Sequence, residues 1–391
     1  MTARALAQAR QGDLPVVNEN ALNAFSVSAS GKLSDVAENW RGFEAQGIDS
    51  PGQSFDFVRC WIARNRIAEK DCLFISARIN ERPLALLPLV RTAMLGGQAA
   101  CFFAGDHVGC NGPLFDRAAF GALTHAEKAS VWRRMLKLAV GVDIVLMPNI
   151  IAEHGREMGL DAAFSRTAAP DFLYRAEFAD WAQCDLERRD KKKRKIDRQQ
   201  RAKLEALGAV SFESVGPGAE GRAIIEIMFA QRARRFEMQG IADPFAAPEV
   251  RAFYMDLFEA AGGVLQVLRL NGEPVAVRYN IPTEDRLHCL ISSMSWCEVT
   301  QTGSPGKQAL LHVMQNVFDE GWTSFDMGKG LTDEKKLWCN KVIDLDCYHH
   351  ARTPLGHMMM LGHQARMQAK GMIKNNSILF DMFRQVRKRL G

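Results

Sequence analysis

The sequence has no close pair of cysteines and no long apolar run. Its nine cysteines are scattered over 391 residues without a C-x-x-C pair, which argues against a disulfide framework and a structural zinc site. We therefore expect reduced thiols, no metal and a cytoplasmic protein. No run of about 18 apolar residues is present, so no transmembrane helix is expected. Residues 1–30 lack the apolar centre of a secretory signal and are expected to form a disordered leader.

The strong catalytic motifs are also missing. The chain contains no G-x-S-x-G elbow, no H-E-x-x-H zinc motif and no G-x-x-x-x-G-K-[ST] phosphate loop. His349 and His350 are adjacent but have no further residues at metal-ligand spacing, so they predict a surface feature rather than a metal site. Any catalytic function must therefore be inferred from weaker patterns.

Positive charge is modest overall and concentrated locally. The formal net charge is +5, which on its own does not imply a nucleic-acid partner. Residues 187–205 hold ten Lys or Arg and four acidic residues, contain no Gly or Pro, and predict a surface helix. A solvated face, a contact with RNA or polyphosphate, and a ligand-facing role all remain open. No aromatic residues interleave the charges to stack on bases, so nucleic acid is not the expected partner.

A repeat divides the chain into two similar halves. The segment 78–86 aligns with 269–277, with four of nine positions identical and three aliphatic exchanges. In both halves a hairpin, a strand, a helix, a glycine and a buried strand follow in the same order, which indicates duplication of one α/β unit. The expected organisation is a first unit at 31–180, a basic connecting helix at 181–210, a second unit at 211–355 and a basic amphipathic helical tail at 356–391. The tail is expected to dock on the body of the protein, or to bind a membrane surface or a protein partner.

A glycine loop in the second unit precedes an amphipathic helix. The loop and the first helical turn consist of Gly303, Ser304, Pro305, Gly306, Lys307 and Gln308. Proline suits the first position of a helix, and a helix N-terminus offers free N–H groups and a positive dipole end to a phosphate. An ordinary strand-to-helix turn is the alternative.

Short motifs continue from this loop to Trp338. They are Ser304-Pro305-Gly306, Leu310-Leu311, Gly321, Phe325-Asp326, Gly328, Gly330, Lys335 and Trp338. In this order they resemble the CelD-type acyltransferases of the GNAT superfamily, which are associated with bacterial cellulose and exopolysaccharide synthesis. The resemblance covers roughly residues 35–350. Glu334 departs from the family pattern, which has an aromatic residue before the lysine. The residues that contact the acceptor are therefore expected to differ from those of the family.

The resemblance implies an α/β (α+β) fold of two tandem GNAT-like domains, as in the Fem-type peptidyltransferases. Each domain would be a mixed, mostly antiparallel sheet flanked by helices, and the first would be degenerate. The second would bind acetyl-CoA or another acyl-CoA, with the pyrophosphate on the helix that begins near Pro305 and the thioester where strands 287–294 and 324–327 separate. Backbone N–H groups of Gly306, Lys307 and Gln308 would be the donors.

Direct attack on a thioester needs a positioned acceptor and a group that takes its proton. Asp326 is the first candidate, and its alternative role is to hold Lys329 or a backbone turn. His288 is the second candidate, with a packed strand histidine as its alternative. Lys335 would hold phosphate or acceptor, and Trp338 would stack on a sugar or close the core. The other residues expected at the acceptor are Lys329, Asp106 and His107.

The function expected from this pattern is acyl-CoA-dependent N- or O-acyl transfer. The acceptor implied by the resemblance is an amino sugar or a saccharide intermediate of envelope or exopolysaccharide synthesis. A Fem-like transferase that uses aminoacyl-tRNA is an alternative, in which the basic helix would face the RNA. A binding or scaffold protein with a degenerate nucleotide site is the third possibility. The expected location is cytoplasmic, including the inner face of the membrane through the basic tail.

Overall fold

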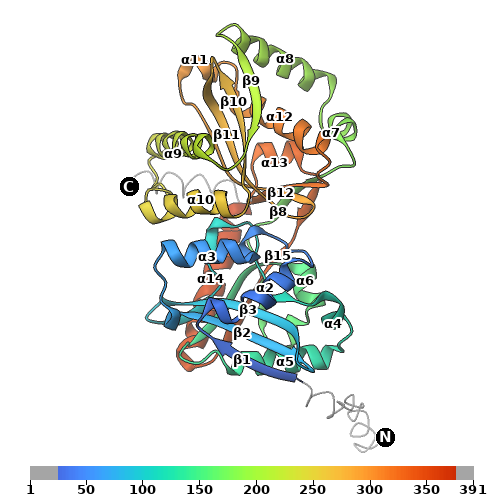
Figure 1. Ribbon diagram of the computed structural model, residues 1–391, viewed down its shortest axis with the longest axis vertical. Helices are drawn as coiled ribbons and strands as arrows, with labels where there is room; N and C mark the ends of the chain where they lie inside the picture. The colour runs from blue at the N-terminus through green and yellow to red at the C-terminus, as the bar shows by residue number, and fades with distance from the viewer. Residues whose placement is uncertain (1–24, 376–391) are drawn as a thin grey trace, which may run out of the picture.

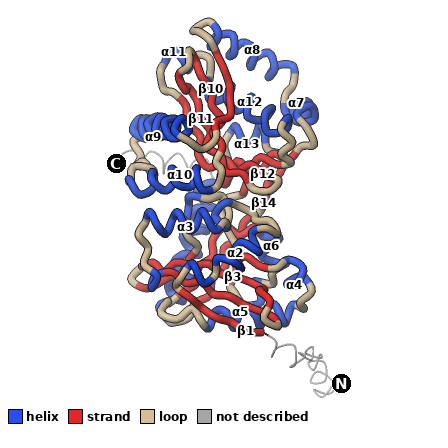
Figure 2. The backbone as a smooth tube through the Cα atoms, in the orientation of Figure 1, coloured by secondary structure: helices blue, strands red, loops and turns tan. Residues whose placement is uncertain are grey.

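The protein folds into two α/β halves joined along the long axis of the molecule (Figure 1). The structure is a computed structural model that describes residues 25–375 of the chain. Each half contains one mostly antiparallel sheet with helices on both faces (Figure 2). This confirms the predicted fold class, a mixed α/β protein made of two similar units. Of the basic amphipathic helical tail expected at 356–391, residues 356–375 are helical and residues 376–391 lie outside the described residues.

The first sheet runs in the order β1-β2-β3-β4-β6-β15-β7, and β5 pairs with β3. Its strands are β1 (Phe25–Ser30), β2 (Cys72–Ile79), β3 (Arg82–Met94), β4 (Gly97–Cys101), β5 (Leu114–Phe115), β6 (Ile144–Ile151), β7 (Ser165–Ala168) and β15 (Leu345–Ala351). The associated helices are α2 (Ala37–Glu44), α3 (Phe55–Arg64), α4 (Arg117–Gly121), α5 (His125–Lys137), α6 (Ala152–Glu157) and α14 (Pro354–Asn375). Phe25–Ser30 were expected in the leader but pair with β2 along their whole length.

The second sheet runs in the order β14-β8-β13-β12-β11-β10-β9. Its strands are β8 (Leu173–Glu177), β9 (Val210–Val215), β10 (Val264–Leu270), β11 (Glu273–Pro282), β12 (Arg286–Met294), β13 (Ser324–Lys329) and β14 (Lys341–Ile343). Its helices are α7 (Trp181–Arg188), α8 (Lys191–Glu205), α9 (Ala219–Gln239), α10 (Pro248–Ala260), α11 (Glu298–Gln301), α12 (Pro305–Asp319) and α13 (Asp333–Trp338). The basic segment thus forms two helices, and Asp190 caps the second of them.

The two repeated segments form the same kind of hairpin. Asn80 and Glu81 connect β2 to β3 with φ angles of 46° and 64°, and Asn271 and Gly272 connect β10 to β11 with φ angles of 52° and 85°. Two successive positive φ angles define the tight turn that matches the twist of paired strands. The sequence repeat therefore corresponds to a structural repeat.

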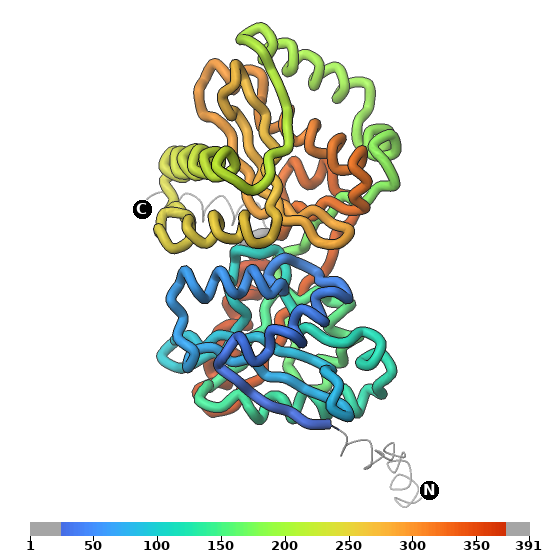
Figure 3. The backbone as a smooth tube through the Cα atoms, in the orientation of Figure 1, coloured from blue at the N-terminus to red at the C-terminus, as the bar shows by residue number. Residues whose placement is uncertain are grey.

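The halves exchange one strand each. β8 lies in the first half of the sequence but pairs with β13 and β14 in the second sheet. β15 comes from the end of the second half and pairs with β6 and β7 in the first sheet, as the red segment within the lower body shows (Figure 3). The exchange connects the two halves. Each sheet therefore includes one strand from outside the sequence range expected for its domain.

Aromatic side chains fill the junction between the halves. Helix α3 of the first half packs on helix α10 of the second, and the ring centroids of Phe57 and Phe253 are 5.0 Å apart. Trp61 packs on the same Phe253 ring at 4.9 Å. Both phenylalanines belong to one buried cluster that spans the two sheets. Burial of this apolar surface stabilises a fixed arrangement of the two halves.

A half-buried ion pair near the junction predicts a pH-dependent stability. Asp49 Oδ2 lies 2.9 Å from His154 Nδ1. Burial raises the pKa of Asp49, but the hydrogen bond and charge of His154 outweigh it and leave that pKa below its usual value. The hydrogen bond from Asp49 raises the pKa of His154 against the effect of burial. The pair is therefore fully charged between the ordinary pKa values of the two groups, about 4 and about 6.5.

Asp49→Asn should lower the free energy of unfolding by roughly 1 kcal/mol at about pH 5.5, where both partners are charged. The loss should shrink at about pH 9, because the native histidine is then neutral and the wild type has lost the same attraction. Urea unfolding of both proteins at the two pH values measures the difference. An effect that does not change with pH would show that the charge on His154 contributes nothing.

Candidate active site

A cleft opens where β12 and β13 separate. The two strands pair in parallel over three positions, Arg286 with Ser324, Leu287 with Phe325 and His288 with Asp326. Beyond these positions the strands diverge around a cleft of about 460 Å³. The lining includes Cys289, Leu290, Ser292, Ser293 and Met294 of β12, Met327 of β13, and residues of α9, α12 and α13.

The N-terminus of α12 forms one wall of this cleft. Ser304 precedes the helix with φ 51° and ψ 62°, and Pro305 occupies its first turn. Gly306 lines the cleft, and a Cβ atom at this position would lie 2.8 Å from Met294 Sδ. Gly303 instead faces α8, where a Cβ atom would lie 2.4 Å from Leu204 Cγ. The two glycines therefore have different roles, one opening the cleft and the other allowing two helices to approach.

Two donors expected for a phosphate have partners within the helix. The backbone N–H groups of Lys307 and Gln308 donate to the carbonyl of Ser304 at 3.0 and 3.1 Å. The buried side chain of Gln308 donates from Nε2 to the Asp197 carbonyl of α8 at 3.1 Å. The Lys307 side chain is exposed. Of this set, Gly306 lines the cleft, and Lys307 is exposed in the first turn of α12.

Asp326 is buried and does not line the cleft. Its Oδ2 atom accepts a hydrogen bond from Arg175 Nε at 2.7 Å, and its Oδ1 atom accepts one from the backbone N–H of Gly328 at 2.7 Å. Phe325 and Met327, its neighbours on β13, belong to the cluster packed under α12. Asp326 therefore points to the opposite face, where it fixes a guanidinium and a turn.

His288 is also buried away from the cleft lining. Its Nε2 atom lies 3.1 Å from Thr283 Oγ1, and its Nδ1 atom lies 3.9 Å from Asp326 Oδ2. Burial lowers the pKa of His288 to about 4, so the ring is neutral near pH 7. The structure thus brings the two expected proton acceptors together, but outside the cleft.

Lys335 closes the loop after β13. Its ammonium group donates to the carbonyls of Gly328, Lys329 and Gly330 at 3.1, 2.7 and 2.8 Å. All three ammonium donors are used in this way, and the side chain also lines the cleft. Its contribution is to hold the loop that shapes the cleft.

The remaining acceptor candidates lie in two other places. Lys329 forms an ion pair with Asp106, and His107 Nδ1 lies 3.0 Å from Tyr254 OH at the junction of the halves. Trp338 is buried in the core, with its ring centroid 6.2 Å from that of Trp181. None of these four candidates lines the cleft as the described residues define it.

The arginines inside the cleft were not predicted from the sequence. Arg278 of β11 is buried and donates from Nη2 to Glu334 Oε2 at 3.0 Å, while its Nη1 atom lies 3.9 Å from Cys289 Sγ. Arg232 and Arg235 of α9 also line the cleft. The one residue of the sequence that pointed to this part of the cleft was Glu334, where the chain differs from the CelD-type pattern that it resembles. The structure explains this departure, because the carboxylate pairs with Arg278.

A β-bulge lies at the point of separation. Tyr279 of β11 faces Ile291, and the next residue, Asn280, faces Cys289. Leu290 is therefore the extra residue of β12, and it lines the cleft. A bulge leaves one residue outside the regular ladder, so its backbone groups become available to a ligand.

A family model agrees with this geometry. Residues 191–336, from α8 to α13, match the acetyltransferase (GNAT) domain. The chain contains a GNAT acetyltransferase domain. Its enzyme class is therefore acyltransferase, and GNAT domains typically use acyl-CoA. The match identifies a GNAT domain but not the CelD-type group within that superfamily, so membership of that group is a proposal. No curated protein sequence matches the chain significantly.

Solved structures resemble the chain beyond the GNAT domain. FemX matches with a TM-score of 0.54 and 10% identity, over 76% of this chain and 92% of its own. The L-PGS of Bacillus licheniformis matches with a TM-score of 0.52 and 14% identity, over 84% of this chain and 96% of its own. At these identities the likeness shows the fold alone, which extends over both halves.

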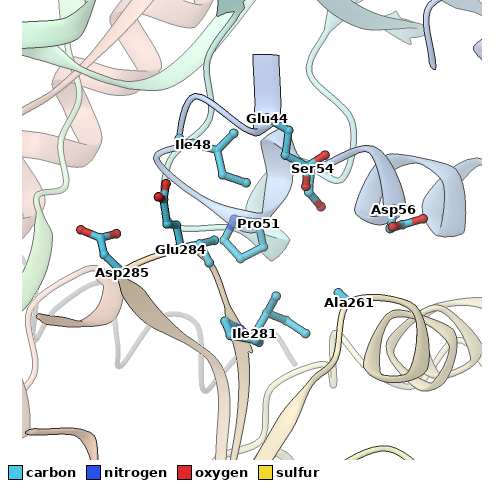
Figure 4. A pocket seen from close by; sticks show the side chains of 12 residues that line it. Glu44, Ile48, Pro51, Ser54, Asp56, Ala261, Ile281, Glu284 and Asp285 are labelled. Carbon is cyan, nitrogen blue, oxygen red and sulfur yellow. The ribbon is translucent and has the colours of Figure 1, made fainter. Parts of the chain in front are cut away.

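A second, smaller hollow lies between the two halves (Figure 4). It has a volume of about 170 Å³ and is formed by the α2–α3 loop and the turn from β11 to β12. Four carboxylates line it, Glu44, Asp56, Glu284 and Asp285, and no Lys or Arg is part of its lining. This hollow is too small and too acidic to hold a nucleoside diphosphate.

Within residues 25–375, no cluster of three or more His, Cys, Asp or Glu side chains is arranged to hold a metal ion. None of the helices in this part of the chain is long and apolar enough to cross a bilayer.

Proposed function

We propose that the protein transfers an acyl group from acetyl-CoA or another acyl-CoA to an amine or hydroxyl. The observation that carries this proposal is the cleft between the separated strands, which has a helix N-terminus on its wall. A cleft of this shape accepts an extended pantetheine arm, and the helix end attracts a pyrophosphate. The match of residues 191–336 to a GNAT domain supports the same assignment.

The chain would bind the two ends of the co-substrate with different groups. Gly306 and the exposed ammonium group of Lys307 would meet the pyrophosphate at the start of α12. The thioester would lie beside the bulge at Leu290, where a backbone N–H outside the ladder would stabilise the oxyanion. The acyl-CoA supplies the activated acyl group, and these residues orient it.

Glu334 is the carboxylate that we propose to meet the acceptor. Asp326 and His288 are sealed behind the strands, whereas the Glu334 side chain is 38% exposed and lines the cleft. Arg278 holds it in place at 3.0 Å. A carboxylate at this position would orient an attacking amine or hydroxyl and take its proton. An amino sugar or saccharide acceptor, as the CelD-type resemblance implies, fits this role.

Glu334→Gln should lower the rate of acyl transfer about 100-fold, because the amide cannot take a proton. The dissociation constant of acetyl-CoA should stay unchanged, since Glu334 does not touch the end of α12 in this arrangement. Release of free CoA thiol from acetyl-CoA, with glucosamine as the acceptor probe, measures the rate.

The adjacent Asp333 provides a matched control. It also lines the cleft, but its side chain is fully exposed and pairs with the exposed Lys336. Asp333→Asn should change the rate by less than about twofold. Equal effects of the two variants would remove Glu334 from the proposed mechanism.

The Fem-like alternative is favoured by one feature, the free charge of α8. Six of its cations form no ion pair within the described residues: Lys191, Lys192, Lys193, Lys195, Arg198 and Lys203. They suit a polyanion such as the aminoacyl-tRNA of a Fem-like transferase. Binding of tRNA that falls steeply with salt, without any binding of acetyl-CoA, would favour this alternative.

A further inference from the structure

Arg232 of α9 is held rigidly at the cleft without a carboxylate partner. Its guanidinium carbon lies 4.6 Å from the centre of the Phe236 ring and 5.5 Å from that of Phe245. Its Nη1 atom donates to the Ser292 carbonyl at 3.3 Å, and its buried Nε atom has no hydrogen-bond partner. The aromatic rings fix the plane of the guanidinium, so several donors remain for a ligand.

The two buried arginines of the second sheet are paired, whereas Arg232 is half-buried. Arg175 contacts Asp326 and Arg278 contacts Glu334, each through an ion pair of 3.0 Å or less. Arg232 forms none, and burial together with the neighbouring charge of Arg235 lowers its pKa to about 10. Arg235 lines the same cleft and likewise forms no ion pair within the described residues. Two cations held close together without an ion-paired carboxylate favour a ligand that supplies an anion.

The two arginines face the cleft from a different side than the co-substrate site. The sheet separates α9 from α12, because strand residues such as Val277 and Tyr279 pack in the α9 cluster, whereas Phe325 and Met327 pack under α12. The cleft passes through the sheet between β12 and β13 and reaches both helices. A phosphate at the start of α12 therefore leaves the cations of α9 unoccupied.

The charge of the cleft also favours a second anion. Its lining contains four cations, Arg232, Arg235, Arg278 and Lys335, but only two carboxylates, Asp333 and Glu334. Arg278 pairs with one carboxylate, and Lys335 is saturated by backbone carbonyls. The uncompensated positive charge thus belongs to the α9 wall.

We propose that Arg232 and Arg235 bind a phosphate group of the acceptor. The acceptor would then be a phosphorylated amine or alcohol, with its phosphate on α9 and its nucleophile at the thioester. An arginine fork matches two phosphate oxygens, which a lysine cannot reproduce. This inference rests on the proposed function and deepens it by naming the class of acceptor.

Calorimetric titration of inorganic phosphate into protein saturated with CoA tests the proposal. The wild type should bind phosphate in addition to CoA. Arg232→Met and Arg235→Met should each weaken phosphate binding about tenfold or more, because each removes a charge-assisted contact. Arg232→Lys should recover only part of the affinity. Affinity for CoA should change less than about twofold in all three variants.

Arg234→Met is the matched control, because Arg234 lies on the same helix but is 61% exposed and pairs with Glu237. It should leave phosphate binding unchanged. If Arg232→Met does not fold, Arg235→Met still tests the site, since Arg235 is only partly buried.

The outcomes separate the two proposals. Failure of the wild type to bind CoA would overturn the proposed function. Binding of CoA without binding of phosphate would overturn only the phosphate site. A loss of CoA affinity of about tenfold in Arg232→Met would show that the arginines serve the phosphates of CoA itself, and would also overturn the assignment to the acceptor.

Discussion

Gly306→Trp is expected to weaken the binding of acetyl-CoA about 100-fold or more. A Cβ atom at this position already lies 2.8 Å from Met294 Sδ, and the indole would extend into the cleft between β12 and β13. The ring would occupy the space that the co-substrate needs and cover the end of α12. Isothermal titration with acetyl-CoA measures the loss.

Gly216 offers a control for the size of the new side chain. It lies in the same half, and nothing lies within 4 Å of a Cβ atom at that position. Gly216→Trp should therefore bind acetyl-CoA as the wild type does. Retained affinity in Gly306→Trp, with the protein folded, would place the co-substrate elsewhere.

Arg175→Met is expected to lower the free energy of unfolding by about 3–5 kcal/mol. Its guanidinium pairs with Asp326 at 2.7 Å, and both side chains are about 95% buried. Removing the cation leaves a carboxylate in the interior whose hydrogen bond from the Gly328 N–H does not neutralise its charge. Arg175 Nη2 also donates to the Asp49 carbonyl at 3.1 Å, so the contact between the halves is weakened as well.

Two comparisons isolate the cause. Arg201→Met breaks an exposed pair with Glu205 and should cost less than about 1 kcal/mol. Arg175→Met combined with Asp326→Leu should be more stable than Arg175→Met alone, because no buried charge is then left unpaired. Denaturant unfolding of the variants gives the values. Equal losses for Arg175→Met and Arg201→Met would contradict the role assigned to the buried pair.

The parts of the fold that the sequence could predict depend on local patterns. The hairpins at 78–86 and 269–277 follow from turn residues between alternating apolar positions. Helix α12 follows from Pro305 and the apolar stripe behind it. The exchange of β8 and β15 could not be predicted, because a strand's sequence specifies its burial but not which of two similar sheets it joins.

For the candidate site too, features within a continuous segment could be predicted from the sequence, and features that depend on distant contacts could not. The sequence located the glycine loop and the pair of strands, since both are continuous segments. The face on which Asp326 lies depends on the register of β13 against α12, which no motif specifies. The role of Lys335 depends on three backbone carbonyls that only the folded loop brings together. Arg278 follows the apolar residues 274–277 of β11, and no motif marked it as a site residue.

Titration calorimetry of acetyl-CoA into the full-length chain tests the central claim most directly. The acyl-CoA site proposed in the cleft predicts one co-substrate per chain with a dissociation constant in the micromolar range, a binding free energy of about −8 kcal/mol. The absence of any heat of binding at about 1 mM acetyl-CoA would contradict it.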